Sequence, residues 1–381
     1  MSLRTVEATG GKELRDFIRL PNVLHRDDPA WVVRPNFERA SYFNRKHNPV
    51  FREKEVALWV AYDGDKPVGR ISAQAEPGGS AEGQFGCFES TNDTAVADIL
   101  FKTAGSWLSE RSATVMRGPF SLSINDECGM LVDGFDTPPV FLMPHNPPYY
   151  AELCRKSGLE PAMDLLAYGF ELVPPFPPLA LRILQRAQKG GRITLREVPP
   201  KEFGNEIQTI IDIFNDGWAG NWGFEPITTA AANHLAAEVK PLLMKRMVWI
   251  ADYDGVPAAV GLCLPNLNEA LAKIRPGASI GAWLSVIKQV IVKDFRTARI
   301  PLFGLKRQFH GTSAAAELTV AVLDACRRGG LTHNMTWSEI SWILETNAPM
   351  RGIIEDLFHA SLYKRYRVFS KPVGSTSALA N

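Results

Sequence analysis

The sequence predicts an α+β fold with two tandem domains, each a mixed, mostly antiparallel central sheet flanked by helices. The chain has 381 residues, which is longer than a domain with a single hydrophobic core usually is. Four prolines fall between residues 174 and 178, where they interrupt any regular ladder. Strand-like and helix-like segments follow one another in the same order before and after that interruption, which indicates two copies of one architecture.

The composition excludes several classes of function. Lys and Arg number 42 against 41 Asp and Glu, and the basic residues are dispersed, so no basic face for DNA or RNA is expected. No apolar stretch approaches the roughly 20 residues of a membrane span. The first eleven residues are too polar for a secretory signal. We therefore expect a cytoplasmic protein with no nucleic-acid or membrane partner.

The five cysteines are widely separated, and no pair has the CxxC spacing of a metal or redox site. They are Cys87, Cys128, Cys154, Cys263 and Cys326. This pattern favours buried free thiols in a reducing compartment. The acidic pair Asp126 and Glu127 has no His or Cys at metal-ligand spacing, so no metal is expected.

The first domain is expected to span residues 1–173. A strand at 3–8 and a helix at 11–20 precede two apolar runs, 56–62 and 67–75, which a turn at Asp63 and Gly64 joins into a hairpin. A strand at 84–89, a periodic helix at 94–110 and a strand at 114–117 follow. A helix at 149–157 and a strand at 165–172 end the domain.

A linker and helix at 174–191 lead to the second domain, 192–372, and to a flexible tail, 373–381. The second domain restarts with a strand at 192–198 and helices at 201–216 and 228–243. A hairpin, 247–253 with 257–264, turns at Asp254 and Gly255. The remaining elements are helices at 278–292, 313–328 and 349–357 and strands at 300–305, 335–340 and 365–371.

The segment 300–328 carries the most chemical information. After its apolar strand come Arg307, Gln308, Phe309, His310, Gly311, Thr312 and Ser313, and then an alanine-rich helix. A loop of glycine and small residues at a helix start presents free backbone N–H groups and the positive end of the helix dipole. Such a site holds a diphosphate, although the same pattern also occurs as a plain capped helix.

This loop resembles the acyl-CoA loop of the Gcn5-related N-acetyltransferase (GNAT) superfamily, whose pattern is Gln/Arg-x-x-Gly-x-Gly/Ala. Gln308 and Gly311 match, and Ser313 replaces the third small residue while remaining able to cap the helix through its hydroxyl. The resemblance implies two tandem GNAT-like domains. It places acetyl-CoA or another acyl-CoA in the second domain, at Arg307, Gln308, His310, Gly311, Thr312, Ser313 and Asn347.

In the resembled family, the Asn at the place of Asn347 commonly lies beside the pantetheine. The first domain has no glycine-rich loop after its strand at 84–89, so it is expected to be degenerate. Its polar residues near Glu127 and His145 could shape an acceptor site or be structural only.

Catalytic groups follow less directly from the sequence. Ile354 stands where the family commonly has a tyrosine that protonates the leaving thiolate; Tyr363 and Tyr366 lie close enough in sequence to replace it. Candidate bases for the amine are Glu339, Glu345 and His310, although spacing alone does not perturb a pKa and favours a solvated or structurally hydrogen-bonded side chain for each.

The loop 216–226 carries four candidate acceptor-binding residues, Trp218, Asn221, Trp222 and Glu225. In the resembled fold this region often lines the acceptor pocket, and the alternative is a hydrophobic plug. The main hypothesis is an acyl-CoA-dependent N-acyltransferase acting on a small-molecule or peptide amine. The alternatives are an inactive binding or scaffold protein of the same fold, and an aminoacyl-tRNA-dependent transferase of the peptidoglycan-crosslinking type.

Overall fold

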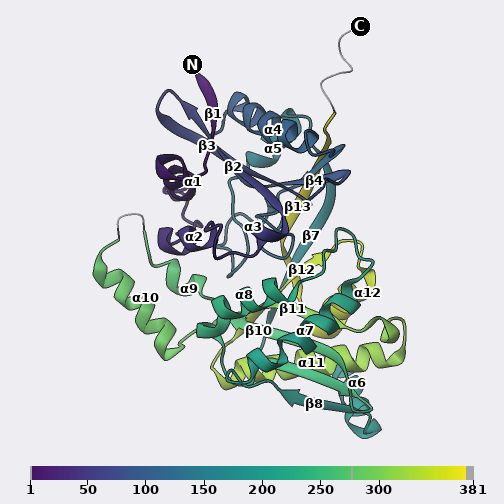
Figure 1. Cartoon of the computed structure of the whole chain (residues 1–381). Coiled ribbons are helices and arrows are strands. Elements are labelled where there is room, and N and C mark those ends of the chain that lie inside the picture. Colours follow the sequence, from purple (N-terminus) through teal and green to yellow (C-terminus); the bar gives the residue numbers. More distant parts are fainter. Residues whose placement is uncertain (1, 276–277, 375–381) are drawn as a thin grey trace. The chain divides into compact units, whose positions relative to one another are not determined.

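The computed structural model describes residues 2–275 and 278–374, which form two compact units. Unit 1 comprises Met1–Leu165, Ile274–Ala278 and Lys364–Asn381; unit 2 comprises Leu166–Lys273 and Ser279–Tyr363. Each unit contains a mixed sheet with helices packed on it, which confirms the predicted α+β fold (Figure 1). Of the tail expected at 373–381, residues 375–381 lie outside the described residues.

The first half of the chain forms β1 (Leu3–Glu7), α1 (Gly11–Leu24), α2 (Asn36–Tyr42), α3 (Val50–Glu53), β2 (Glu55–Asp63), β3 (Lys66–Ala75), β4 (Glu82–Ser90), α4 (Thr94–Ser109), β5 (Val115–Gly118), β6 (Met130–Asp133), α5 (Tyr150–Lys156) and β7 (Glu160–Glu171). The second half forms α6 (Pro178–Gly190), β8 (Ile193–Glu197), α7 (Phe203–Trp218), α8 (Thr229–Val239), β9 (Val248–Tyr253), β10 (Val256–Pro265), α9 (Asn268–Leu271), α10 (Ile280–Val292), β11 (Thr297–Leu305), α11 (Ser313–Thr332), β12 (Trp337–Leu344), α12 (Ala348–Gly352) and β13 (Ser361–Pro372).

The two units repeat one strand arrangement. The sheet order is β1-β2-β3-β4-β5 in unit 1 and β8-β9-β10-β11-β12 in unit 2. Neighbouring strands are antiparallel except for the last pair in each unit, which is parallel and begins at Glu82↔Val115 and at Thr297↔Trp337. The common order that the sequence indicates is thus present in the strand pairing itself.

A strand from a distant part of the chain extends each sheet. β13, near the C-terminus, pairs with β5 from Phe369↔Gly118 to Pro372↔Val115. β7 lies beside β12 in the sheet order. The proline-rich segment expected as the linker therefore lies within the range of unit 2, while most of the C-terminal strand belongs to unit 1.

The core of unit 1 lies on both faces of its sheet. Alternate residues of a strand point to opposite faces: Trp59 packs in the cluster that includes α4 and α5, and Leu58 packs in the cluster that includes α1 and α2. Such two-sided burial explains why the β2 segment is apolar at nearly every position. All five cysteines are buried free thiols, as the sequence predicts.

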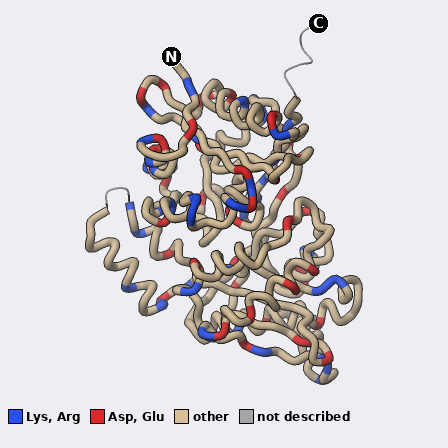
Figure 2. The backbone as a smooth tube through the Cα atoms, in the orientation of Figure 1, with Lys and Arg blue, Asp and Glu red and all other residues tan. Residues whose placement is uncertain are grey.

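The charged residues are interspersed along the chain. Figure 2 shows Lys and Arg alternating with Asp and Glu over the tube. Within residues 2–275 and 278–374, no helix is both long and apolar enough to cross a membrane.

Ending the chain after Tyr363 is expected to unfold unit 1. The truncation removes Tyr366, Val368 and Phe369, which are at most 1% exposed, and burying each such side chain contributes about 1.5–3 kcal/mol. Hydrogen exchange of the β5 amides would measure the loss. A chain ended after Gly374 keeps the whole of β13 and serves as the control. Undiminished protection of β5 in the shorter chain would contradict the assignment of β13 to unit 1.

Candidate functional site

A pocket in unit 2 opens where β11 and β12 part. Their parallel pairing ends at Ile300↔Ile340, although both strands continue beyond these residues. Past this point Phe303, Leu305 and Ile343 line a pocket of about 410 Å³. The lining is mostly apolar, so the pocket suits an extended ligand with an apolar portion.

The loop between β11 and α11 lies at the rim of this pocket. Gly311 has a φ of +75°, and no heavy atom lies within 4 Å of the position a Cβ would take there, so a ligand can approach the backbone closely. In the part of the chain that the structure describes, the backbone N–H groups of Gly311, Ser313 and Ala314 donate no hydrogen bond. The start of α11 therefore offers unpaired donors and the positive end of a long helix dipole.

The structure corrects one detail of this helix start. Thr312, not Ser313, is the N-cap residue, and no side chain caps the helix. Thr312 instead donates its hydroxyl to the Phe309 carbonyl at 2.7 Å. Ser313 is the first helical residue and is exposed.

The residues expected to bind the cofactor fall into two groups. His310, Gly311 and Asn347 line the pocket. The other four are exposed and lie outside its lining: Arg307, Gln308, Thr312 and Ser313. Arg307 is held in place by Asp216, whose carboxylate accepts from the Arg307 backbone N–H at 2.8 Å.

His310 is the titratable side chain that lines this pocket in the described structure. Its Nε2 lies 3.0 Å from the Leu305 carbonyl. Because a carbonyl only accepts, Nε2 carries the proton, and Nδ1 is left as an acceptor. The ring therefore fixes the loop to the end of β11.

The carboxylates expected as bases lie elsewhere. Glu339 is fully buried in β12, where Tyr363 and Ser341 donate hydroxyl hydrogen bonds to it and Arg299 lies 3.6 Å away. Glu345 is exposed and is not part of the pocket lining. Glu339 was expected as a base because of its position in the sequence. It is instead the buried partner of Arg299, a contact that the sequence alone does not reveal.

The expected tyrosine acid is also absent from the unit 2 pocket. Tyr366 is completely buried in the part of β13 that belongs to unit 1, against Gly129. The Tyr363 hydroxyl is engaged by Glu339, and Ile354 is buried. Among the described residues, no tyrosine lines this pocket.

Three of the four expected acceptor residues form one wall of the pocket. Trp218, Asn221 and Trp222 line it, whereas Glu225 does not. The Trp218 indole N–H donates to the Phe303 carbonyl at 2.8 Å, which fixes the ring across the end of β11. This wall of the pocket is therefore largely aromatic, with the Trp218 ring held in place.

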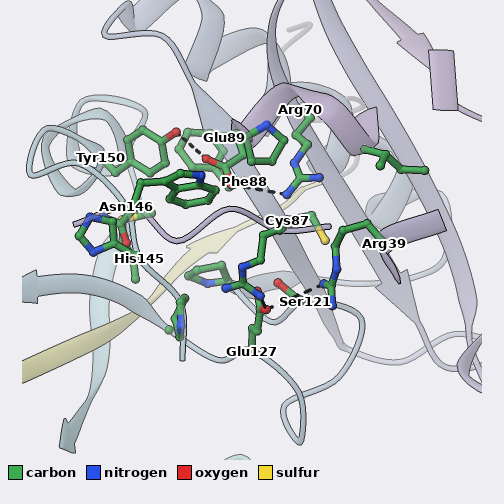
Figure 3. Close-up of a pocket in the computed structure, with 18 residues that line it drawn as sticks. Arg39, Arg70, Cys87, Phe88, Glu89, Ser121, Glu127, His145, Asn146 and Tyr150 are labelled. Atoms are coloured by element: carbon green, nitrogen blue, oxygen red, sulfur yellow. Dashed lines mark hydrogen bonds and ion pairs between the residues drawn. The ribbon is translucent and has the colours of Figure 1, made fainter. Parts of the chain in front are cut away.

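Unit 1 contains a second, polar pocket of about 60 Å³ (Figure 3). Figure 3 shows Glu89 between Tyr150 and Arg70. The Glu89 carboxylate lies 2.6 Å from His25 Nε2, accepts from the Tyr150 hydroxyl at 2.8 Å and lies 3.5 Å from Arg70. All four of these side chains are buried.

A second carboxylate and a second histidine complete the pocket. Glu127 is paired with Arg34 and lies 3.9 Å from Arg39. His145 Nε2 lies 2.9 Å from the Asp28 carboxylate. His145 Nδ1 is buried and has no hydrogen-bond partner among the described residues.

Both carboxylates of this pocket are held ionised. Burial raises the pKa of Glu89, but the hydrogen bonds of His25 and Tyr150 and the nearby Arg70 guanidinium outweigh burial, and the pKa lies below its ordinary value. For Glu127, burial is likewise outweighed by Arg34 and Arg39, which lower its pKa. Burial lowers the pKa of His145 despite its contact with Asp28, so this ring is neutral at pH 7.

Part of this pocket was visible in the sequence and part was not. Glu127 and His145 belong to the polar cluster noted in the first half. Arg70 and Glu89 were missed because they lie inside apolar strands. The sequence signal that could have found them is a charged residue within an otherwise apolar strand segment, because a charged side chain is rarely buried without a partner.

Acid is expected to destabilise unit 1. The native pKa values of Glu89 and Glu127 lie below their ordinary value of 4.5, so just below that pH the unfolded chain binds more protons. Their contribution is fully present above about pH 5 and is lost as the pH falls through the native pKa values. Urea unfolding between pH 3 and pH 7, chosen around that ordinary value, would measure it. Glu89→Gln should flatten the slope by up to about 1.4 kcal/mol per pH unit; an unchanged slope would contradict this origin.

Comparison with known proteins places the chain in a family. No family model matches it. It is 38% identical over 365 residues to the bacterial ceramide synthase of Caulobacter vibrioides, with 94% of each chain covered. It is 34% identical over 367 residues to Protein YghO of Escherichia coli, covering 95% of this chain and 93% of that protein.

A solved structure shares the fold over the whole length. It is the tandem GNAT protein from the clavulanic acid biosynthesis pathway, with a TM-score of 0.57 at 13% identity, covering 99% of this chain and 100% of that one. Among the described residues, no group of three or more His, Cys, Asp or Glu side chains could hold a metal ion. The chain therefore belongs to the family that includes the bacterial ceramide synthase and Protein YghO, and it has the fold of tandem GNAT proteins.

Proposed function

We propose that the protein is an acyl-CoA-dependent N-acyltransferase whose donor site is the unit 2 pocket. The observation that carries this proposal is the set of unpaired N–H groups at Gly311, Ser313 and Ala314 beside that pocket. Unpaired amides at a helix start bind phosphate oxygens, and no side chain caps the start of α11.

Different parts of the pocket would bind different parts of the co-substrate. The loop amides would bind the diphosphate of the co-substrate, and Asn347 and Thr346 line the continuation of the pocket toward β12. Acyl-CoA supplies an activated thioester. Backbone groups at the point where β11 and β12 part would polarise its carbonyl as charge develops on the oxygen.

We further propose that the acceptor is a long-chain amino alcohol. The bacterial ceramide synthase is named for a product that is the amide of a fatty acid and such an amine, and it covers 94% of this chain. The aromatic wall of Trp218 and Trp222 suits an aliphatic chain. This acceptor narrows the small-molecule amine expected from the sequence.

The test combines binding with turnover. Thermal unfolding is followed with acetyl-CoA and with palmitoyl-CoA; a true ligand at one hundred times its Kd stabilises the protein by about 2.7 kcal/mol. Release of the free CoA thiol is then recorded with sphinganine, with an aliphatic amine that lacks hydroxyl groups, and without an amine. We expect stabilisation by palmitoyl-CoA and thiol release that requires sphinganine.

The two alternatives give different results. A scaffold protein of this fold would release no thiol with any amine, whether or not acyl-CoA stabilises it. An aminoacyl-tRNA-dependent transferase would respond to no CoA derivative. Either result would reject the proposed reaction.

A further inference from the structure

The two units carry different side chains at equivalent positions. Counted from the hairpin turns, which close with the same register and the same bulge, Arg70 of β3 corresponds to Val260 of β10. Arg70 faces Glu89, and Val260 faces Gly304. Because unit 2 forms the same strand pairing with Val260 and Gly304, the pairing itself does not require a charged pair at this position.

The charges in unit 1 are costly unless they serve a purpose beyond packing. Removing a carboxylate and a guanidinium from water costs several kcal/mol each, and an apolar pair of similar volume is often as stable or more so. Arg70 and Glu89 are each 8% exposed. They line an open pocket together with Glu127 and His145, so their polar groups remain available to a ligand.

Two buried polar atoms of this pocket lack a partner in the described structure. Arg70 Nε–H is a donor without an acceptor, and His145 Nδ1 is an acceptor without a donor, because Nε2 donates to Asp28. A ligand hydroxyl group can accept a hydrogen bond from Arg70 Nε–H or donate one to His145 Nδ1, because a hydroxyl both accepts and donates. The space of about 60 Å³ exceeds the roughly 10–15 Å³ that a water requires, so a small polar group fits.

Glu89 retains capacity for a cation. A carboxylate offers about four acceptor positions. Three of the Glu89 positions are taken, by His25, Tyr150 and Arg70. The Arg70 contact, at 3.5 Å, is the longest of the three. An ammonium group approaching from the pocket can use the remaining position.

We propose that the unit 1 pocket binds the polar head of an amino alcohol, its ammonium group on Glu89 and its hydroxyl groups on Arg70 and His145. This inference deepens the proposed function, on which it rests for the class of acceptor. It selects, for the polar residues of the first unit, the acceptor-site alternative that the sequence leaves open over the structural one.

Calorimetric titration of the full chain separates the two kinds of contact. The probes are 2-amino-1,3-octanediol, 1,3-octanediol without the amine, and 2-aminooctane without the hydroxyl groups. We expect the amino diol to bind at least about tenfold more tightly than either comparator, the change that one lost charge-assisted hydrogen bond produces. Equal binding of all three would overturn the proposal.

Variants assign the contacts to residues. Glu89→Gln should weaken amino diol binding about tenfold, to the level of the plain diol. His145→Phe, which keeps a ring in place, should remove the preference for hydroxyl groups. Glu110→Gln makes the same chemical change as Glu89→Gln on the exposed surface of unit 1 and should change nothing. If Glu89→Gln lowers the melting temperature too far, His145→Phe decides the result alone.

A further control keeps this inference separable from the donor site. Ser313→Glu places a charge at the start of α11 in unit 2 and should leave amino diol binding unchanged. One outcome is that acyl-CoA binds and free CoA thiol is released with sphinganine while Glu89→Gln leaves the affinity for the amino diol unchanged. In that case the inference fails and the proposed function stands. If no CoA derivative binds, the proposed function fails first.

Discussion

Ser313→Glu is expected to abolish acyl-CoA binding without unfolding the protein. Ser313 is exposed at the first position of α11, where a carboxylate interacts favourably with the helix dipole. The same carboxylate would lie beside the unpaired amides of Gly311 and Ala314 and repel a diphosphate. We expect at least a tenfold loss of affinity, about 1.4 kcal/mol, and loss of the thermal shift.

The first unit supplies a matched control for this change. Thr94 holds the equivalent first position of α4, where the Asp93 carboxylate already accepts the Ala95 N–H at 2.9 Å. Thr94→Glu therefore adds the same charge to a helix start that is already capped by an acid, and acyl-CoA binding should be unchanged. Equal loss in both variants would point to a general electrostatic effect and against the unit 2 site.

Glu339→Ala is expected to destabilise unit 2 by about 3–5 kcal/mol, because it leaves the Arg299 guanidinium buried without its carboxylate. The Tyr363 and Ser341 hydroxyl groups lose their acceptor as well. Urea unfolding at pH 7 would measure the change.

Glu345→Ala is the matched comparison, since it removes an exposed carboxylate near the end of the same strand. Its effect should stay within about 0.5 kcal/mol. A Glu339 variant of unchanged stability but lost turnover would restore Glu339 as a candidate base. The expected pattern, lost stability with normal turnover per folded molecule, identifies it as structural.

Local signals in the sequence predicted much of the fold. The hairpin of β2 and β3 was found because an apolar run, a Gly-containing turn and a second apolar run are adjacent in the chain. β6 was missed, because Met130–Asp133 is short and pairs with β13 far along the sequence. The same distance hid the fact that β13 completes unit 1.

The candidate site divides in the same way. The loop around Gly311 was predictable because its unpaired donors all lie within residues 311–314. The pocket around Glu89 draws His25 from the segment after α1, Arg70 from β3 and Tyr150 from α5. No spacing rule connects these positions, so only the folded chain brings them together.

The position of β13 also bears on how the protein is made. The ribosome first translates the part of unit 1 that ends at Leu165, and then unit 2, before the final strand of unit 1 emerges. Until then the nascent chain displays the open edge of β5, with unpaired amides that chaperones or another chain could cover. A premature stop in the last few codons of β13 would therefore damage the domain encoded at the opposite end of the gene.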